Sequence, residues 1–182
     1  MIAVSGCSLG GKAPDLLLTL TPESMVRAEA GTTTSAANAV TVVRPSVPQA
    51  LDTTRIPVRM GATTVEYLKD AFWVDTPSDL FRALLSETIA ARTGRAVLDP
   101  LQFSFDPGTR LTGQLQNFGL DADRMEAVVT YDAALGRGAD SVSTRRFEAR
   151  VPVSAATRDA VAPALNQAAN RVATEVSDWI GR

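Results

Sequence analysis

The residue with the most informative chemistry in this chain is Cys7, the only cysteine among 182 residues. It ends the run Ser5-Gly6-Cys7, which follows a short apolar stretch and precedes Ser8. Small residues before a lone cysteine resemble a bacterial lipobox, in which a signal peptide is cut before the cysteine and the sulfur takes a diacylglyceryl group. The alternative is a buried, unreactive thiol, because free cysteine behaves as a small hydrophobic residue. Residues 1–13 contain nothing typical of a core segment, so the lipobox interpretation is favoured.

The candidates for catalysis are few, because the sequence contains no histidine. Histidine is the commonest general base and metal ligand, and a single cysteine can form neither an intrachain disulfide nor a cysteine-based zinc site. Two carboxylate pairs remain, Asp70 with Asp75 and Asp121 with Asp123, since acid–base catalysis can use two carboxyls in different environments. Asp75 flanks a predicted helix start and the other pair brackets a turn, so structural roles are favoured. We expect no enzyme activity, no cofactor and no metal site.

The overall composition excludes other classes of protein. The formal net charge is −2 at pH 7, whereas nucleic-acid-binding domains carry a strongly basic face, so no nucleic-acid partner is expected. The sequence has no run of about 20 apolar residues of the kind that spans a bilayer. We divide the chain into residues 1–13, a lipobox remnant with a flexible tether, and residues 14–182, a single domain.

Two helices are predicted, over residues 78–93 and 154–180. The first has Thr76 as N-cap, Pro77 at the first helical position and Gly94 as its stop signal, a typical arrangement of helix ends. The second carries an apolar stripe with a period close to 3.6 residues, and Pro163 inside it predicts an irregular first turn or a kink in the helix. The stripe consists of Val161, Leu165, Ala168, Val172, Val176 and Trp179.

The remaining segments favour strands. We predict strands over residues 15–20, 40–47, 56–60, 63–67, 95–98, 110–118, 125–135 and 141–153, from β-branched content, alternation and turn residues. In the segment 110–118, strict alternation places Asn117 on the same side as Leu111 and Leu115. The predicted fold class is α+β, with a mostly antiparallel sheet and the two main helices packed on one of its faces.

A family resemblance rests on several segments that follow Cys7 in a fixed order. These are residues 18–22 (LTLTP), 51–58 (LDTTRIPV), 65–75 (VEYLKDAFWVD), 80–85 (LFRALL) and 164–170 (ALNQAAN). Their order and spacing resemble the ABC-type transport auxiliary lipoproteins, the group that includes the PqiC-like lipoproteins. The resemblance extends from Cys7 to Trp179.

The resemblance implies a non-catalytic lipoprotein with an α+β fold. Proteins of this kind are accessory components of ABC systems that carry MCE-domain proteins and move lipids between the inner and outer membranes of Gram-negative bacteria. The implied partners are the MCE-domain protein with its ABC permease and ATPase, further copies of the chain itself, and the membrane that holds acylated Cys7. The implied location is the periplasm, on the outer membrane because Ser8 rather than Asp follows the anchor.

Two questions remain open from the sequence. One is whether the domain is instead a lipid carrier with its own acyl-chain pocket. The other is whether Tyr67, Phe72 and Trp73 contact a partner, since aromatic residues dominate interface energetics, or lie in the core, which is favoured for each. Phe72 and Trp73 are adjacent on a predicted strand and therefore point to opposite faces of it.

Overall fold

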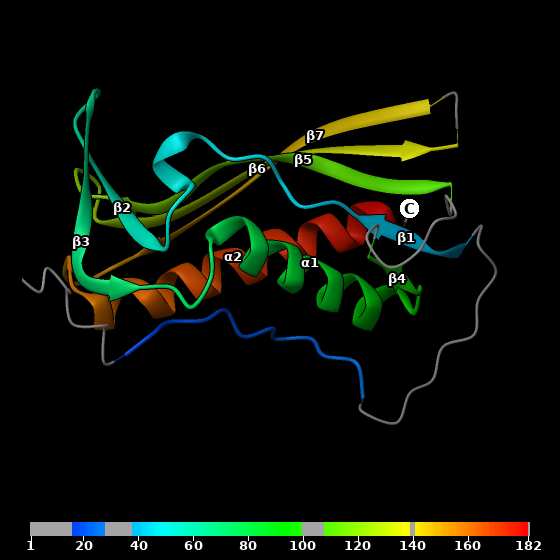
Figure 1. Ribbon diagram of the computed structural model, residues 1–182, viewed down its shortest axis with the longest axis horizontal. Coiled ribbons are helices and arrows are strands. Elements are labelled where there is room, and N and C mark those ends of the chain that lie inside the picture. The colour runs from blue at the N-terminus through cyan, green and yellow to red at the C-terminus, as the bar shows by residue number, and fades with distance from the viewer. Residues whose placement is uncertain (1–15, 28–37, 100–107, 139–140, 182) are drawn as a thin grey trace, which may run out of the picture.

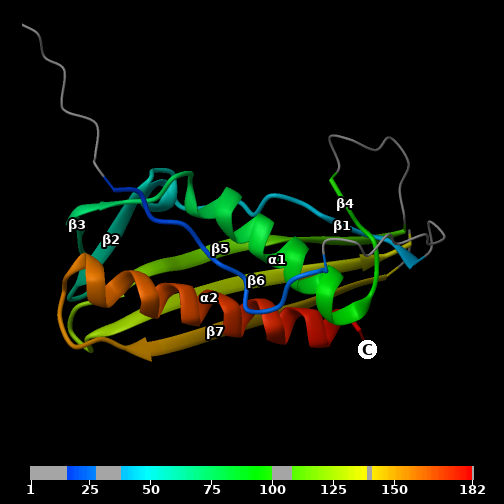
Figure 2. The same ribbon diagram turned by 90° about the horizontal axis from the view of Figure 1, so that it is seen from below.

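The computed structural model describes residues 16–27, 38–99, 108–138 and 141–181. The figures show the sheet as one layer, with both helices against the same face of it and residues 16–27 running across the helices on their other side (Figures 1 and 2). The elements of this described part are β1 (Val40–Val42), the 3-10 helix η2 (Gln49–Leu51), β2 (Arg55–Met60), β3 (Thr64–Phe72), α1 (Pro77–Thr93), β4 (Val97–Leu98), β5 (Thr109–Asp121), β6 (Glu126–Arg137), β7 (Ser141–Pro152) and α2 (Arg158–Ile180).

The seven-stranded sheet is mixed, so the prediction of a mostly antiparallel sheet is wrong, while the α+β class is confirmed. The pairs β2–β3, β5–β6 and β6–β7 are antiparallel, whereas β1–β4, β1–β5 and β2–β5 are parallel. The parallel pairs arise because α1 carries the chain back along the sheet, and parallel neighbours need such a crossover. The alternation of apolar and polar residues along a strand does not show whether its neighbouring strands run parallel or antiparallel to it.

Strand β5 lies in the middle of the sheet and has different pairing partners along its two edges. Along one edge it pairs with β6 over its whole length. The other edge is divided, with β1 and the Ser46–Gln114 bridge beside its first half and β2, through Val58–Leu120, beside its end. Between these points the chain leaves the edge and forms η2. Pro57 contributes to this division, because it has no N–H to extend the β2–β5 ladder backwards.

A β-bulge in β5 reverses its alternation. The β5–β6 register shifts between Leu115 and Asn117, which leaves Gln116 as an extra residue. Leu115 and Phe118 are therefore both buried in the core. Asn117 lies on the opposite face, where its amide donates a hydrogen bond to the Thr130 hydroxyl over 3.2 Å. The prediction that Asn117 shares a side with Leu115 is wrong, because one extra residue inverts every later position.

Helix α1 agrees with its sequence signals at both ends. Thr76 is the N-cap residue, and Gly94 ends the helix in a left-handed conformation with φ 66°. The Thr76 hydroxyl does not cap a backbone amide. It donates instead to the Asp79 carboxylate over 2.6 Å, and Arg44 forms an ion pair with the same carboxylate over 2.7 Å. Side-chain pairing thus fixes the first turn of α1 to the segment that follows β1.

Helix α2 begins at Arg158, four residues later than predicted. It has Thr157 as N-cap and continues as one helix through Pro163. Its buried side chains include five of the six residues of the predicted stripe, and Trp179 is partly buried against the same core. The five buried residues are Val161, Leu165, Ala168, Val172 and Val176.

Aromatic pairs join α1 and the residue that follows β3 to the middle of the sheet. Phe81 of α1 meets Tyr131 of β6 edge to face, with ring centroids 5.3 Å apart, and Trp73 meets Phe118 of β5 at 5.6 Å. The Tyr131 hydroxyl donates to the Thr112 carbonyl over 2.9 Å, which supplies the polar partner that a buried phenol needs. Burial raises the pKa of Tyr131, so this group remains a neutral donor.

We predict that Gly119→Ala destabilises the domain. A Cβ at this position would lie 2.3 Å from the Pro57 carbonyl oxygen, so β2 would have to move away from β5. Overpacking of this kind costs about 1–3 kcal/mol, measurable by urea denaturation. Gly136→Ala is the matched control, because its nearest atom, the Arg110 carbonyl oxygen, is 3.9 Å from the added carbon. Equal loss of stability in both variants would contradict the assigned contact.

Candidate functional site

Cys7 lies outside the described residues, so lipid attachment at this position stays a prediction. The described residues nearest to it in sequence are 16–27, which we call the strap. Their solvent exposure alternates, with Leu18, Leu20 and Pro22 less exposed than Leu17, Thr19 and Thr21. Leu18 and Leu20 pack against the core. The strap is thus an extended segment with one face on the domain, in the position where a tether from Cys7 joins it.

The start of the strap is fastened to the end of β3. The Leu18 N–H donates to the Phe72 carbonyl over 2.7 Å, and the Val74 N–H donates to the Leu18 carbonyl over 2.8 Å. These bonds make a single parallel bridge between Leu18 and Trp73. The predicted strand over residues 15–20 is therefore extended chain with one bridge, and from there the strap turns across the helices instead of continuing along the sheet (Figure 2).

Two asparagines of α2 hold the middle of the strap. The Asn170 side-chain oxygen accepts the Glu23 N–H over 2.8 Å, and its amide nitrogen donates to the Thr21 carbonyl over 2.9 Å. One turn earlier, the Asn166 oxygen accepts the Thr21 N–H over 2.8 Å. Because an amide carries both a donor and an acceptor, Asn170 pairs with the strap much as a neighbouring strand would. We call Asn166 and Asn170 the asparagine clamp.

The environment of Asn170 explains the importance of this contact. Its side chain is only 2% exposed, and a buried amide without partners costs about 1–3 kcal/mol. The strap supplies two hydrogen-bond partners for this amide. The backbone carbonyl of Asn166 accepts a further hydrogen bond from the Asn170 amide nitrogen over 2.9 Å. Further along, the Glu87 carboxylate of α1 accepts the Val26 N–H over 2.7 Å. Both helices therefore bind the strap through side-chain-to-backbone hydrogen bonds.

The three aromatic candidates have different positions. Trp73 is 1% exposed and belongs to the core. Tyr67 has a structural role, because its hydroxyl donates to the Ala50 carbonyl of η2 over 3.3 Å and the Arg55 guanidinium lies 4.5 Å from its ring centroid. Phe72 is only partly buried and points away from the side of Trp73. Phe72 is therefore the aromatic candidate that remains available for a partner.

The carboxylate candidates are explained by local structure. Asp75 accepts the Thr76 N–H over 2.7 Å and Asp123 accepts the Gly61 N–H over 2.9 Å. Asp70 has a left-handed backbone, with φ 51°, in the part of β3 where the register with β2 shifts. Asp121 is 4% exposed and accepts hydrogen bonds from two arginines, as described next.

Asp121 is the centre of a charged network on the face of the sheet away from the helices. Arg59 and Arg124 donate to its carboxylate over 2.9 and 3.3 Å, and Arg150 lies 3.6 Å from it. Burial alone raises the pKa of this carboxyl, but the hydrogen bonds and charge of the arginines outweigh burial, so the pKa lies below its usual value. Arg150 also pairs with Glu148 over 2.8 Å. This network joins β2, β5 and β7.

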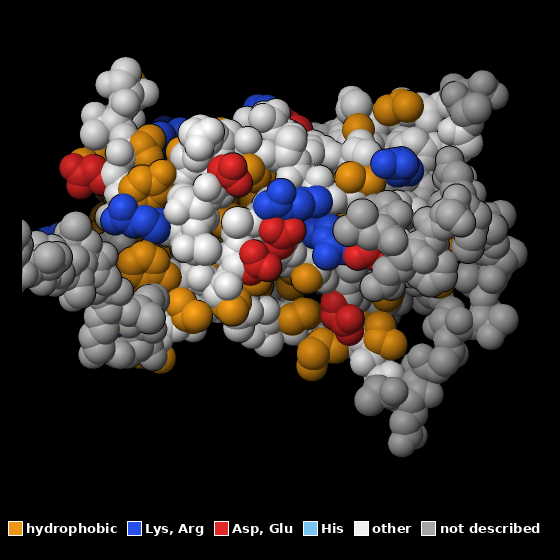
Figure 3. Space-filling view, in the orientation of Figure 1, with side chains coloured by type: hydrophobic (Ala, Val, Ile, Leu, Met, Phe, Trp, Pro, Cys, Tyr) orange, Lys and Arg blue, Asp and Glu red, His pale blue; other side chains and the backbone are white. Residues whose placement is uncertain are grey.

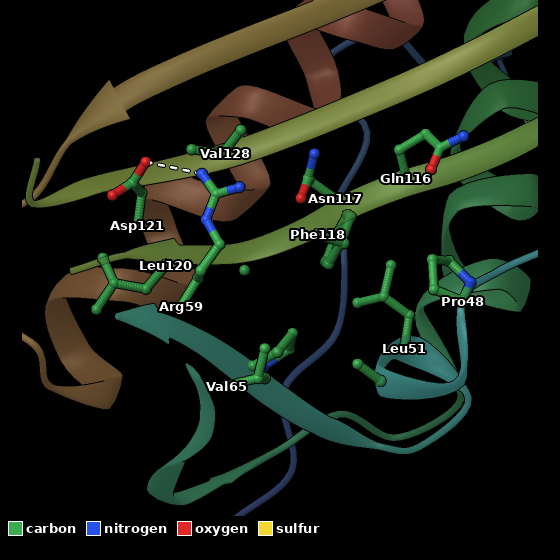
Figure 4. Close-up of a pocket in the computed structure, with 13 residues that line it drawn as sticks. Pro48, Leu51, Arg59, Val65, Gln116, Asn117, Phe118, Leu120, Asp121 and Val128 are labelled. Carbon is green, nitrogen blue, oxygen red and sulfur yellow. Dashed lines mark hydrogen bonds and ion pairs between the residues drawn. The ribbon is translucent and has the colours of Figure 1, made fainter. Parts of the chain in front are cut away.

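A pocket opens beside this network, where the edge of β5 is divided between β1 and β2. It has a volume of about 180 Å³. Ligand pockets for drug-sized molecules measure roughly 300–1,000 Å³, so this one has room for a single apolar side chain or ring. Figure 4 shows Arg59, Gln116 and Asn117 on its polar side. Its apolar wall includes Pro48, Leu51, Pro57, Val65, Leu120 and Val128.

The strap and this pocket were not predicted from the sequence. The pocket forms because β1 and β2 pair with separate parts of β5, and the residue pattern within a single strand does not show such an arrangement. The clamp has a weak signal, because Asn166 and Asn170 are polar residues four positions apart within a helix, next to its apolar stripe. Among the described helices, none is long and apolar enough to cross a membrane, and the described residues contain no group of three His, Cys, Asp or Glu residues suited to a metal ion.

Comparison with known proteins decides the family. The family model described as the ABC-type transport auxiliary lipoprotein component matches residues 18–177. The chain belongs to this family. The match begins at Leu18, the residue that fastens the strap to β3, and includes the asparagine clamp. The family is described as a transport auxiliary component rather than as an enzyme, and a lipoprotein of a transport system is located in the cell envelope.

Solved structures support the same fold. A crystal structure of a Xanthomonas campestris protein of the family DUF330 has a TM-score of 0.71 and 22% identity, covering 90% of this chain and 94% of that one. A crystal structure of an uncharacterised protein has a TM-score of 0.69 and 13% identity, covering 81% of this chain and 94% of the other. At these identities the likeness concerns the fold. The search of curated proteins found no match.

We predict that Asn170→Ala releases the strap. The substitution removes two hydrogen bonds to strap backbone, and typical bonds of this kind contribute about 0.5–1.5 kcal/mol each. Amide hydrogen exchange at Glu23 should accelerate by an order of magnitude or more relative to the central amides of β6. Asn166→Ala removes only the bond to the Thr21 N–H and should leave Glu23 protected. Unchanged protection of Glu23 in Asn170→Ala would refute the clamp.

We predict that the stabilisation by Asp121 disappears in acid. Its pKa is lowered on folding, so its contribution is complete well above the unfolded-state value of about 3.9 and is lost as the pH falls through the lower folded-state value. Asp121→Asn should therefore be less stable than the wild type at pH 7 by about 1–3 kcal/mol, with a smaller difference near pH 3. Urea denaturation across this range measures it. A difference independent of pH would contradict the ionic role.

Proposed function

We propose that the protein is a non-catalytic periplasmic lipoprotein, anchored through acylated Cys7, that serves an ABC-type system for lipid transport between the inner and outer membranes. Its proposed partners are the MCE-domain protein of that system and, through it, the permease and ATPase. The proposed anchoring membrane is the outer membrane, because Ser8 follows the cysteine. The family match over residues 18–177 is the observation that carries this proposal.

The arrangement of the strap supports an anchored role. Eight residues, 8–15, separate Cys7 from Leu16, and the chain is then fixed to the domain by β3, the asparagine clamp and Glu87. A domain attached in this way is held at one defined point beside the membrane. Stable lipid anchoring takes more than one acyl chain, which a diacylglyceryl cysteine provides on a single residue.

The size of this apolar pocket favours docking over lipid carriage at this site. A larger hollow of about 780 Å³ near the end of α2 is lined mainly by polar and charged residues, among them Arg92, Arg95 and Arg137, which do not suit acyl chains. The volume of the apolar pocket, about 180 Å³, is close to the roughly 150 Å³ of an engineered cavity that holds one benzene molecule. A two-chain lipid is far larger than that. The pocket therefore fits one apolar group of a partner, and we propose the auxiliary role ahead of a carrier with its own acyl-chain site.

The test compares the wild type with Cys7→Ser in the native host. We expect radiolabelled palmitate to enter the wild type, and the wild type to sediment with outer-membrane fractions and to co-purify with an MCE-domain protein and its ATPase after cross-linking. Cys7→Ser should lose the label and the membrane association, because it has no thiol to acylate.

Ser8→Ala is the matched control, because it changes the neighbouring residue and keeps the thiol. It should retain both the label and the partners. A wild type that takes up no palmitate would refute the anchor. Labelled protein that cross-links to no component of such a transport system would refute the proposed partner class while leaving the anchor intact.

A further inference from the structure

An apolar surface lies where the strap meets the end of β3. Leu16, Leu17 and Val74 are 60%, 52% and 54% exposed, and Phe72 between them is partly exposed. We call these four residues the tether-exit patch. In Figure 3 hydrophobic side chains are visible at the end of the molecule where Figure 1 places β3. Large exposed apolar side chains that gather in one place mark interaction surfaces more often than scattered ones do.

The bridge between Leu18 and Trp73 explains why three of these side chains, Leu17, Phe72 and Val74, lie together, and Leu16 adjoins them in sequence. Side chains alternate along extended chain, so the neighbours of this pair face the other way. Leu18 and Trp73 point toward the core, and Leu17, Phe72 and Val74 therefore share the outward side. The two hydrogen bonds of 2.7 and 2.8 Å that join Leu18 to Phe72 and Val74 hold this outward group in place.

Leu16, the first described residue after Cys7, belongs to this patch. Nine residue steps join Cys7 to Leu16, and extended chain covers at most about 3.6 Å per residue, or roughly 32 Å in all. The asparagine clamp and Glu87 prevent the strap from sliding away and moving this exit point. The surface that holds the lipid of Cys7 therefore lies within roughly 32 Å of Leu16.

We propose that the tether-exit patch rests on the phospholipid bilayer that holds the acyl chains of Cys7, so that the domain has one fixed orientation on the membrane. This inference depends on the acylation of Cys7 in the proposed function. Leu and Phe side chains are typical of surfaces that enter the interface between headgroups and acyl chains. The patch is too small to bind a bilayer tightly by itself. It can still contact the bilayer because the anchor holds it at a high effective concentration there. The anchor provides affinity, and the patch provides orientation.

The single cysteine of the chain makes a direct test possible. In acylated protein the Cys7 sulfur is a thioether, so a cysteine introduced by Val74→Cys is the only site that a thiol-reactive NBD dye can label. The matched control is Val142→Cys, because Val142 is 72% exposed and the start of β7 lies at the opposite end of the molecule from the end of β3 (Figures 1 and 2). Both full-length acylated proteins are reconstituted in vesicles of phosphatidylethanolamine and phosphatidylglycerol.

The expected result is a blue-shifted NBD emission at position 74, with quenching by aqueous iodide several-fold weaker than at position 142. Replacing both leucines in the Val74→Cys protein, by Leu16→Ser and Leu17→Ser, should restore quenching toward the level at position 142. Equal quenching at the two positions in acylated protein would overturn the inference while leaving the lipid anchor intact.

Two control measurements are needed. The first shows whether lipid or protein shields the patch, and the second shows whether Cys7 is acylated. The Cys7→Ser, Val74→Cys protein, measured without vesicles, should show iodide quenching as strong as at position 142. Shielding there would mean that protein rather than lipid covers the patch, and it would overturn the inference. Dye attached to Cys7 itself would show a free thiol, which refutes the proposed anchor and the inference that depends on it.

Discussion

The hydrogen bonds between the Asn170 amide and the strap are the interaction on which the rest of this structure depends. The amide is 2% exposed, so leaving it without partners would cost about 1–3 kcal/mol, and the strap supplies two of those partners. The helix in turn gives the strap the hydrogen bonds that it does not find in a sheet. The strap and the Asn170 amide thus supply each other's hydrogen-bond partners, and the strap is held in one position on α2.

The sheet provides the rigid support for that path. The stripe of α2 is buried against β6 and β7, and its partner helix α1 joins β6 through the Phe81–Tyr131 pair. Strand β5 has one continuous edge with β6 and one divided edge with β1 and β2. The division leaves the small pocket beside Asp121. The charged network there ties the ends of β2, β5 and β7 together, on the face of the sheet away from α1 and α2.

Much of the local structure could be predicted from the sequence, because helix caps and apolar stripes are local signals. Thr76, Gly94 and the stripe of α2 were placed correctly for this reason. The errors came from relations between distant segments. The single extra residue at Gln116 inverts the later half of β5, and the direction of its parallel neighbours is set by the crossover through α1. The predicted strand over residues 15–20 falls at the start of the strap, whose burial alternates as in a strand although most of its hydrogen bonds go to side chains of the two helices.

Three observations support the proposal that the domain is held at the membrane by its N-terminus, with the strap bound as part of the fold. They are the lipobox-like run that ends at Cys7, the family match over residues 18–177, and a strap that follows that cysteine after eight intervening residues and is fastened to both helices. The most direct test is intact-mass and fragmentation mass spectrometry of the protein extracted from the membranes of its native host. We expect a mature chain that begins at Cys7, with the mass of diacylglyceryl and acyl groups located on that residue. A chain that retains Gly6 and carries an unmodified thiol at Cys7 would contradict membrane anchoring through this residue.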